Sequence, residues 1–171
     1  MSKFNKIQSK ILSLNELVKQ VEDWKHGGEK VVFTNGCFDI LHKGHVAYLA
    51  KAADFGTKFI VAVNSDDSVK RLGKDKNRPI QDENSRALII ASLEVVDAVI
   101  IFNEDTPNEL IKAILPDVLV KGGDYNPEET NPSSKAYIVG SDVVRQKGGE
   151  VKIISLVEGY STTNIVSKLK D

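Results

Sequence analysis

The chain has 171 residues, of which 41% are hydrophobic and 27% charged, and its formal net charge is −1. Such a composition is typical of one soluble globular domain with a hydrophobic core. The nearly balanced charge argues against nucleic acid or an anionic membrane as a partner, and no apolar run is long enough to span a bilayer. A single cysteine, Cys37, excludes an intramolecular disulfide. With the polar N-terminus, it favours a cytoplasmic protein.

Short apolar runs alternate with helix-like segments along the chain. Ser13 can cap a first helix, which the pair Gly27-Gly28 would end. The pattern predicts, in order, a helix at 14–25, a strand at 31–34, a helix at 41–55, a strand at 59–63, a polar loop at 64–77, a helix at 82–94, a strand at 98–102, a helix at 107–114, a strand at 117–120, a loop at 121–133, a helix at 135–147, a strand at 151–156 and a helix at 161–169.

Five strands separated by helices predict a single α/β domain, in which helices cover both faces of a five-stranded parallel sheet. Residues 1–28 are expected to form an N-terminal helical extension that packs on the sheet or on a second copy in a homodimer. In such sheets the ligand binds beyond the carboxyl ends of the strands. The loops expected to surround one site are therefore 34–45, 64–78, 102–106, 121–133 and 156–163.

The stretch 36–45, which reads GCFDILHKGH, follows the first predicted strand. Gly36 permits a tight turn, and the helix that follows offers free N–H groups and the positive end of its dipole to a phosphate. His42 and His45 are three residues apart, so they should lie on one face of the first helical turn and can donate hydrogen bonds to phosphate. Gly44 leaves room for a nucleotide beside the backbone. A histidine pair alone is often incidental, but the complete pattern favours a nucleotide site.

This stretch resembles the HxGH signature of the nucleotidylyltransferase superfamily, a Rossmann-like group that includes the cytidylyltransferases. The resemblance implies that residues 29–171 form the nucleotidylyltransferase domain. It also implies that His42 and His45 contact the nucleotide phosphates and stabilise the transition state of nucleotidyl transfer.

The resemblance extends to a second basic region and to a turn near the C-terminus. Cytidylyltransferases use an arginine at the start of a helix, matched by Arg86, and a loop lysine, matched by Lys74 or Lys76. The implied nucleotide-binding residues are Thr34, Asn35, Gly36, Phe38, Gly44, Ser161, Thr162 and Thr163, and the implied substrate-side residues are Asp39, Lys121 and Asp124. For Asp39, ordering the loop or the metal environment is favoured over action as a base.

Two positions differ from the alcohol-phosphate cytidylyltransferases. Leu156 stands where those enzymes carry an arginine, and Gly123 stands where an acidic residue could contact cytosine. The segments EDTP, ILPD, KGGDY and STTNI resemble adenylyltransferases that act on heptose 1-phosphate. That resemblance implies adenylyl transfer from ATP to the sugar 1-phosphate D-glycero-β-D-manno-heptose 1-phosphate, which gives pyrophosphate and ADP-heptose, a lipopolysaccharide precursor.

The implied cofactor is Mg²⁺, held by the triphosphate and water and without a dedicated protein site. In many bacteria this enzyme is fused to a sugar kinase, for which 171 residues leave no room, so a standalone transferase is expected. One alternative is a cytidylyltransferase of the glycerol 3-phosphate type. A second is a non-catalytic nucleotide-binding module, against which the intact histidine signature argues.

Overall fold

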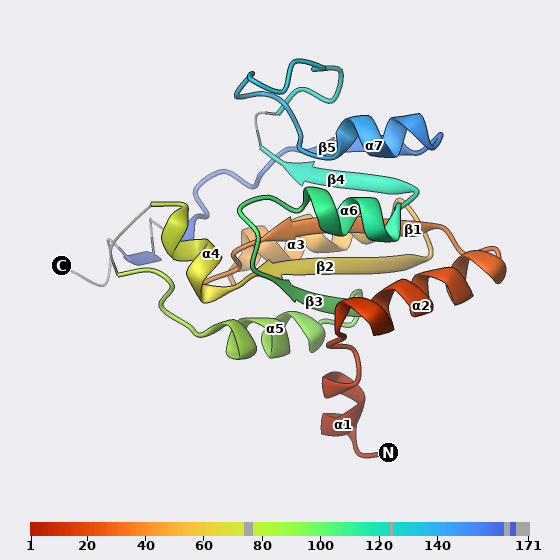
Figure 1. Cartoon of the computed structure of the whole chain (residues 1–171). Coiled ribbons are helices and arrows are strands. Elements are labelled where there is room, and N and C mark those ends of the chain that lie inside the picture. The colour runs from red at the N-terminus through yellow and green to blue at the C-terminus, as the bar shows by residue number, and fades with distance from the viewer. Residues whose placement is uncertain (74–76, 124, 163–164, 167–171) are drawn as a thin grey trace.

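A sheet of five parallel strands forms the centre of the molecule (Figure 1). The computed structural model describes residues 1–73, 77–123, 125–162 and 165–166. The strands are β1 (Val31–Gly36), β2 (Lys58–Asn64), β3 (Ala98–Phe102), β4 (Val118–Gly122) and β5 (Glu150–Ile154). Their order in the sheet is β3-β2-β1-β4-β5, and all neighbouring pairs are parallel. The predicted five-stranded parallel sheet is confirmed.

The helices agree with the predictions less closely than the strands do. They are α1 (Lys3–Gln8), α2 (Leu14–His26), α3 (Lys43–Ala53), α4 (Asp66–Arg71), α5 (Glu83–Ala91), α6 (Asn108–Ile114) and α7 (Ser141–Gln146). Two short helices, α1 and α4, were not predicted. The helix predicted at 135–147 is wrong in its first half, because Gly140 takes a left-handed conformation and α7 begins only after it. The predicted last helix at 161–169 lies largely outside the described residues.

The N-terminal segment packs into the same core as the sheet. The Ser13 side chain accepts the backbone N–H of Glu16, and the Glu16 carboxylate accepts the N–H of Ser13, so a capping box starts α2. Leu17 and Val21 of α2 are fully or almost fully buried. Ahead of α2, a backbone bridge joins Ile11 to β3. Helix α2 and the residues just ahead of it therefore lie against the sheet, and the division of the chain at residue 28 stays a prediction.

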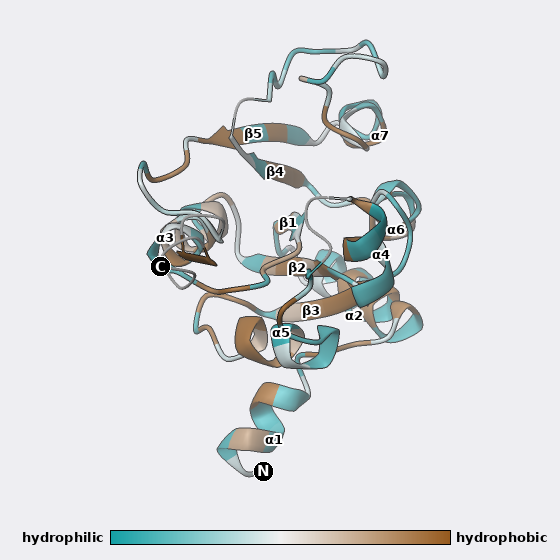
Figure 2. Cartoon of the chain, turned by 90° about the vertical axis from the view of Figure 1, so that its left-hand side faces the viewer, coloured by the Kyte–Doolittle hydropathy of each residue, from teal (hydrophilic) through white to brown (hydrophobic). Residues whose placement is uncertain are grey.

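Two groups of helices cover the two faces of the sheet. On one face, α3 and α5 bury Tyr48, Leu49, Ala52, Ala87, Ile90 and Ala91. On the other face, α2, α6 and α7 bury Leu17, Val21, Leu110, Ile111, Ile114 and Val144. Figure 2 shows these layers end on, with hydrophobic strands between them. A strand that is buried on both faces reads as a continuous apolar run, which is why the strands could be predicted well.

The sheet order places a switch point between β1 and β4. From β1 the chain continues through β2 and β3 on one side, and β4 and β5 then add on the other side. In open parallel sheets this is where a crevice forms at the carboxyl ends of the strands. The last residues of β1 and β4, Gly36 and Gly122, lie at that edge. Within the described part of the chain, no helix has the length and apolar character needed to cross a membrane.

Candidate active site

His42 is the N-cap residue of α3, directly beyond the carboxyl end of β1. Its backbone is extended, and its Nδ1 accepts the backbone N–H of His45 at 3.4 Å. The two imidazole rings stack at 18° with their centroids 3.8 Å apart. Burial lowers the pKa of His42, so the ring is neutral at pH 7. Because Nδ1 is the acceptor, the hydrogen of the neutral ring is on Nε2, which remains a donor.

His45 lies deeper and is enclosed by its own loop. The ring of Phe38, a residue with φ of 47°, meets the His45 ring edge-on at 5.4 Å. Burial, together with the nearby charges of His42 and Arg78, lowers the pKa of His45 to about 4, and the Ile40 backbone opposes this shift. The His45 Nδ1 is buried and has no hydrogen-bond partner among the described residues. A buried polar atom without a partner is unusual in a folded protein.

Gly44 brings the C-terminal turn close to the start of α3. A Cβ at this position would lie 3.0 Å from the His42 ring and 3.1 Å from the Cβ of Tyr160. The Lys43 ammonium lies 5.3 Å from the centre of the Tyr160 ring. Of the predicted residues in this turn, Thr162 is almost buried and Ser161 is partly exposed. The described part of the predicted 156–163 loop therefore lies beside the histidine loop, at Tyr160.

Asp39 joins the histidine loop to the loop that precedes α5. Its carboxylate is fully buried and accepts the backbone N–H groups of Ile80 and Gln81 and the Nε of Arg78, at 2.8, 3.1 and 2.9 Å. The Asp39 carbonyl also accepts the Gln81 side chain at 2.7 Å. Both carboxylate oxygens are therefore occupied by protein donors, and Asp39 orders the loop. Its predicted contact with substrate stays a prediction.

Arg86, predicted to contact phosphate, is completely buried. Its Nε donates to the Gln81 carbonyl, Nη1 to the Cys37 carbonyl and Nη2 to the Asp66 carboxylate, at distances of 2.7 to 2.9 Å. The side chain thus ties the histidine loop to the start of α4 and to the loop before α5. In this arrangement Arg86 holds the surrounding loops in place, and its predicted catalytic role stays a prediction.

Side chains at the end of β1 also form hydrogen bonds with residues of β4. The buried Thr34 hydroxyl bonds to the Tyr48 hydroxyl at 2.6 Å and to the Val120 carbonyl at 3.0 Å. The Lys121 ammonium donates to the side-chain oxygen of Asn35. Thr34 and Asn35, both expected to bind nucleotide, therefore also connect β1 to β4.

Leu156 and Gly123, the positions that differ from the cytidylyltransferase pattern, are neighbours. Leu156 is 61% exposed, and one of its methyl groups would lie 3.8 Å from a Cβ on Gly123. Lys74, Lys76, Asp124 and Thr163 lie outside the described residues. Arg78 belongs to the basic stretch that resembles the phosphate-contacting region of the cytidylyltransferases. Its contact with Asp39 joins residues far apart in the chain, so no local pattern predicts that contact.

The described residues near the histidine loop offer few side chains that could bind a metal ion directly. Among the described residues there is no group of three His, Cys, Asp or Glu side chains that could hold a metal ion. The carboxylates of Asp39 and Asp66 already accept hydrogen bonds from arginines. Binding of Mg²⁺ mainly through phosphate and water oxygens, which is the usual mode for that ion, stays a prediction.

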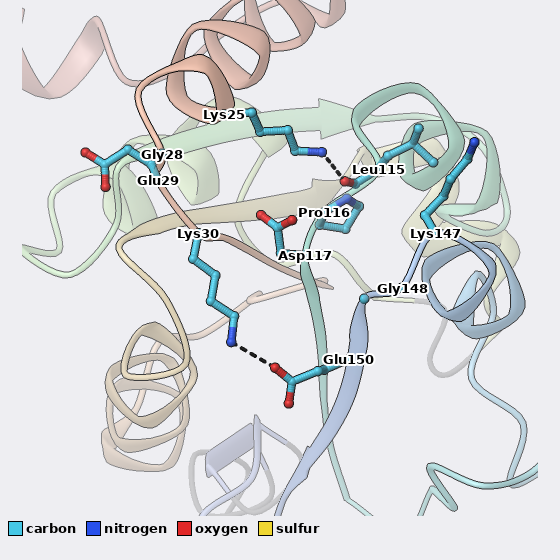
Figure 3. Close-up of a pocket in the computed structure, with 11 residues that line it drawn as sticks. Lys25, Gly28, Glu29, Lys30, Leu115, Pro116, Asp117, Lys147, Gly148 and Glu150 are labelled. Atoms are coloured by element: carbon cyan, nitrogen blue, oxygen red, sulfur yellow. Dashed lines mark hydrogen bonds and ion pairs between the residues drawn. The ribbon is translucent and has the colours of Figure 1, made fainter.

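A cavity of about 550 Å³ lies at the opposite edge of the sheet (Figure 3). It is lined by residues at the amino ends of β1, β4 and β5, which include Lys30, Asp117 and Glu150. Lys30 pairs with Glu150 at 2.8 Å, and Asp117 accepts the N–H of Val31. These charged groups are paired within the protein, and the amino ends of parallel strands are not where α/β sheets bind ligands. The candidate site is therefore the histidine loop.

A parallel sheet with a stacked histidine pair at a helix N-terminus, beyond the strand at the switch point, defines a nucleotide-binding α/β protein. The family model described as cytidylyltransferase-like matches residues 33–168. The chain belongs to this family, and it is a nucleotidyltransferase.

Several known proteins are similar to the chain. The bifunctional protein HldE of Actinobacillus pleuropneumoniae is 53% identical over 160 residues, which cover 94% of this chain and 32% of the relative. The protein of the same name from Wolinella succinogenes is 51% identical over 163 residues, covering 95% of this chain and 32% of the relative. The chain thus spans about a third of the length of these relatives.

Two solved structures share the fold. The lipopolysaccharide core biosynthesis protein of Thermoplasma volcanium is 30% identical, with a TM-score of 0.58, over 78% of this chain and 100% of the other. The pantoate-beta-alanine ligase of Francisella tularensis is 13% identical, with a TM-score of 0.59, over 94% of this chain and 76% of the other. The second likeness concerns the fold alone.

Proposed function

We propose that the chain transfers the adenylyl group of ATP to D-glycero-β-D-manno-heptose 1-phosphate and releases pyrophosphate. The observation that carries the proposal is the stacked pair of His42 and His45 at the N-terminus of α3. The choice of heptose phosphate is supported by the sequence resemblance and by relatives named bifunctional protein HldE at about half identity. A chain with a single cysteine suits a reducing compartment, so we still expect a cytoplasmic location.

In this reaction an oxygen of the sugar phosphate attacks the α-phosphorus of ATP. The bond between the α-phosphorus and its bridging oxygen breaks, and pyrophosphate leaves. The attacking phosphate is already ionised at neutral pH, so catalysis needs position and charge stabilisation more than a strong base. Neutral His42, with its Nε2–H free to donate, and the N–H groups at the start of α3 are suited to that task.

Bound Mg²⁺ would neutralise part of the triphosphate charge. The described residues would hold it only indirectly, through the phosphates that they bind, because the buried Asp39 carboxylate is occupied by protein donors. The residues of this chain would instead fix the phosphate oxygens and exclude water from the reacting centre.

A second candidate is cytidylyl transfer to an alcohol phosphate such as glycerol 3-phosphate, which the matching family description favours. Leu156, which stands in place of an arginine and beside Gly123, argues against it. The deciding experiment measures pyrophosphate release for each of four nucleoside triphosphates with heptose 1-phosphate and with glycerol 3-phosphate. We expect release with ATP and heptose 1-phosphate. Release only with CTP would overturn the proposal, and ATP binding without release from any acceptor would indicate a non-catalytic module.

A further inference from the structure

Two polar side chains of helix α7 carry buried atoms without a partner. Ser141 is 0% exposed, and its Oγ has no hydrogen-bond partner among the described residues. The same is true of the buried Nη2 of Arg145, which lies one helical turn further along α7. Folded proteins rarely bury polar atoms in this way, because each atom loses its hydrogen bonds to water. Two such atoms on one face of a short helix are not explained by the packing of the core.

A tyrosine and an aspartate lie beside these two side chains. The Tyr137 hydroxyl donates to the Asp142 carboxylate at 3.0 Å, in an exposed position. Burial raises the pKa of Tyr137, and Asp142, Ser141 and Arg145 all influence it, so the four side chains lie together. We call Tyr137, Ser141, Asp142 and Arg145 the α7 polar group. Its tyrosine oxygen can still accept a hydrogen bond, and the Ser141 hydroxyl can both donate and accept.

The α7 polar group lies towards the edge of the sheet that carries the histidine loop. Strands β4 and β5 are parallel, so the chain must return from the carboxyl end of β4 to the amino end of β5. Helix α7 makes this return and therefore begins on the side of the carboxyl ends (Figure 1). Ile138 is buried, and Gly140, with φ of 84°, packs closely on Ile111 of α6. These contacts hold the start of α7 in place after the loop that follows β4.

The chemistry of the α7 polar group suits hydroxyl groups better than a phosphate. The charges of Arg145 and Asp142 balance, whereas a phosphate site needs an excess of positive charge. A sugar hydroxyl both donates and accepts hydrogen bonds, so a carboxylate, a guanidinium and two protein hydroxyls can all serve as its partners. The group therefore fits a neutral ligand that carries several hydroxyls.

We propose that the α7 polar group binds hydroxyl groups of the acceptor sugar and selects a heptose phosphate over a smaller alcohol phosphate. This inference rests on the proposed adenylyl transfer, in which the phosphates of both substrates meet at the histidine loop. The sugar then extends from its phosphate towards the start of α7. Glycerol 3-phosphate is shorter and carries fewer hydroxyls, so it reaches fewer of these partners.

The test uses Ser141→Ala and Tyr137→Phe, with Lys112→Met as the control. Lys112 pairs with Glu109 at 2.8 Å on the neighbouring helix α6, where both side chains are exposed. We expect each of the two variants to raise the KM for heptose 1-phosphate by about threefold to tenfold, which is the effect of one hydrogen bond. The KM for ATP should not change, and the control should leave both KM values as they are.

Stability separates this role from a structural one. Ser141→Ala removes a buried hydroxyl that has no protein partner, so the free energy of unfolding should not fall. Urea unfolding measures it. A less stable Ser141→Ala with unchanged KM values would show that the hydroxyl serves the fold, and it would overturn the inference. If Ser141→Ala does not fold, Tyr137→Phe decides, because its ring remains in place.

Calorimetric binding of heptose 1-phosphate and of glycerol 3-phosphate distinguishes this inference from the proposed reaction. If the unchanged chain binds heptose 1-phosphate without releasing pyrophosphate and the variants lose affinity, the reaction is wrong and the sugar contact is supported. If the chain is active and the variants keep their affinity and KM, the sugar contact is wrong and the reaction is supported. An equal loss for both ligands would assign the group to the phosphate, and no binding of heptose 1-phosphate by the unchanged chain would overturn both.

Discussion

The rings of His42 and His45 lie nearly parallel, with their centroids 3.8 Å apart. Two imidazoles in such contact cannot both be protonated without repulsion, and burial already lowers the pKa of each ring. The free protein therefore holds the pair in the neutral form at pH 7. In this form His42 keeps its Nε2–H as a donor for a phosphate oxygen.

The first prediction separates the catalytic use of His42 from its use as a helix cap. His42→Asn keeps a side-chain oxygen that can cap α3, whereas His42→Ala removes the cap and should cost about 1 kcal/mol of the free energy of unfolding. We expect both variants to lower kcat by about 10²-fold or more, because the transition state loses a donor. Steady-state kinetics and urea unfolding measure the two effects. Normal turnover by the asparagine variant would contradict the assignment.

His45 should make the free energy of unfolding depend on pH. Its pKa is about 4 in the folded chain against an ordinary value near 6.5, so the unfolded chain binds more protons between these values. The contribution of neutral His45 to the free energy of unfolding is therefore complete above pH 6.5, and it is lost as the pH falls towards 4. The partial exposure of the ring reduces the expected loss to roughly 1 to 2 kcal/mol.

Urea unfolding between pH 4 and 7 measures this dependence. His45→Gln should flatten the curve relative to the unchanged chain, and His26→Gln, at the exposed end of α2, should not. Identical curves for His45→Gln and the unchanged chain would show that another group is responsible.

Gly44→Ala should impair activity more than stability. The added methyl group would press on the His42 ring at 3.0 Å and on Tyr160 at 3.1 Å. A displaced imidazole is expected to lower kcat/KM by about tenfold to a hundredfold, while alanine favours the helix by up to about 1 kcal/mol. Gly56→Ala is the contrasting case, because its Cβ would lie 2.5 Å from the Lys30 carbonyl and should reduce stability. Full activity in Gly44→Ala would mean that the ring position is not critical.

Arg86→Met should destabilise the protein by about 3 kcal/mol, since it removes a fully buried guanidinium and leaves the Asp66 carboxylate and the carbonyls of Cys37 and Gln81 without their donor. Arg86→Lys should recover little, because one ammonium cannot satisfy three separate acceptors. Arg71→Met removes a more exposed arginine and serves as the control, with a change below about 0.5 kcal/mol. Chemical unfolding measures all three. A stable but inactive Arg86→Met would instead favour direct contact with phosphate.

The sequence was informative where local patterns control the structure. Most strands could be predicted because they are apolar runs buried on both faces, and the cap Ser13 starts α2 as expected. The short polar helix α4 could not be predicted, because six residues give too little periodicity. The start of α7 depends on Gly140, where a Cβ would lie 2.6 Å from Ile111 of α6. That contact forms only in the folded chain.

In the candidate site, too, local arrangements could be predicted from the sequence and contacts between distant residues could not. His42, Gly44 and His45 lie within four residues, so their arrangement could be predicted from spacing. The contacts of Asp39 with Arg78 and of Arg86 with Cys37 join residues 39 and 49 positions apart. A charged side chain in a polar stretch gives no sign of whether folding will bury it, as it does Arg86, or leave its end accessible, as it does Arg78.

The bridge between Ile11 and β3 affects how copies of this chain could associate. Val99 donates its outward N–H to Lys10 and accepts the N–H of Leu12, so the residues ahead of α2 already occupy this edge of the sheet. A strand from a second molecule would have to displace them before it could pair with β3 there. A homodimer built by continuing the sheet would therefore form through β5, the outer strand on the other side, and would leave the N-terminal residues free of the contact.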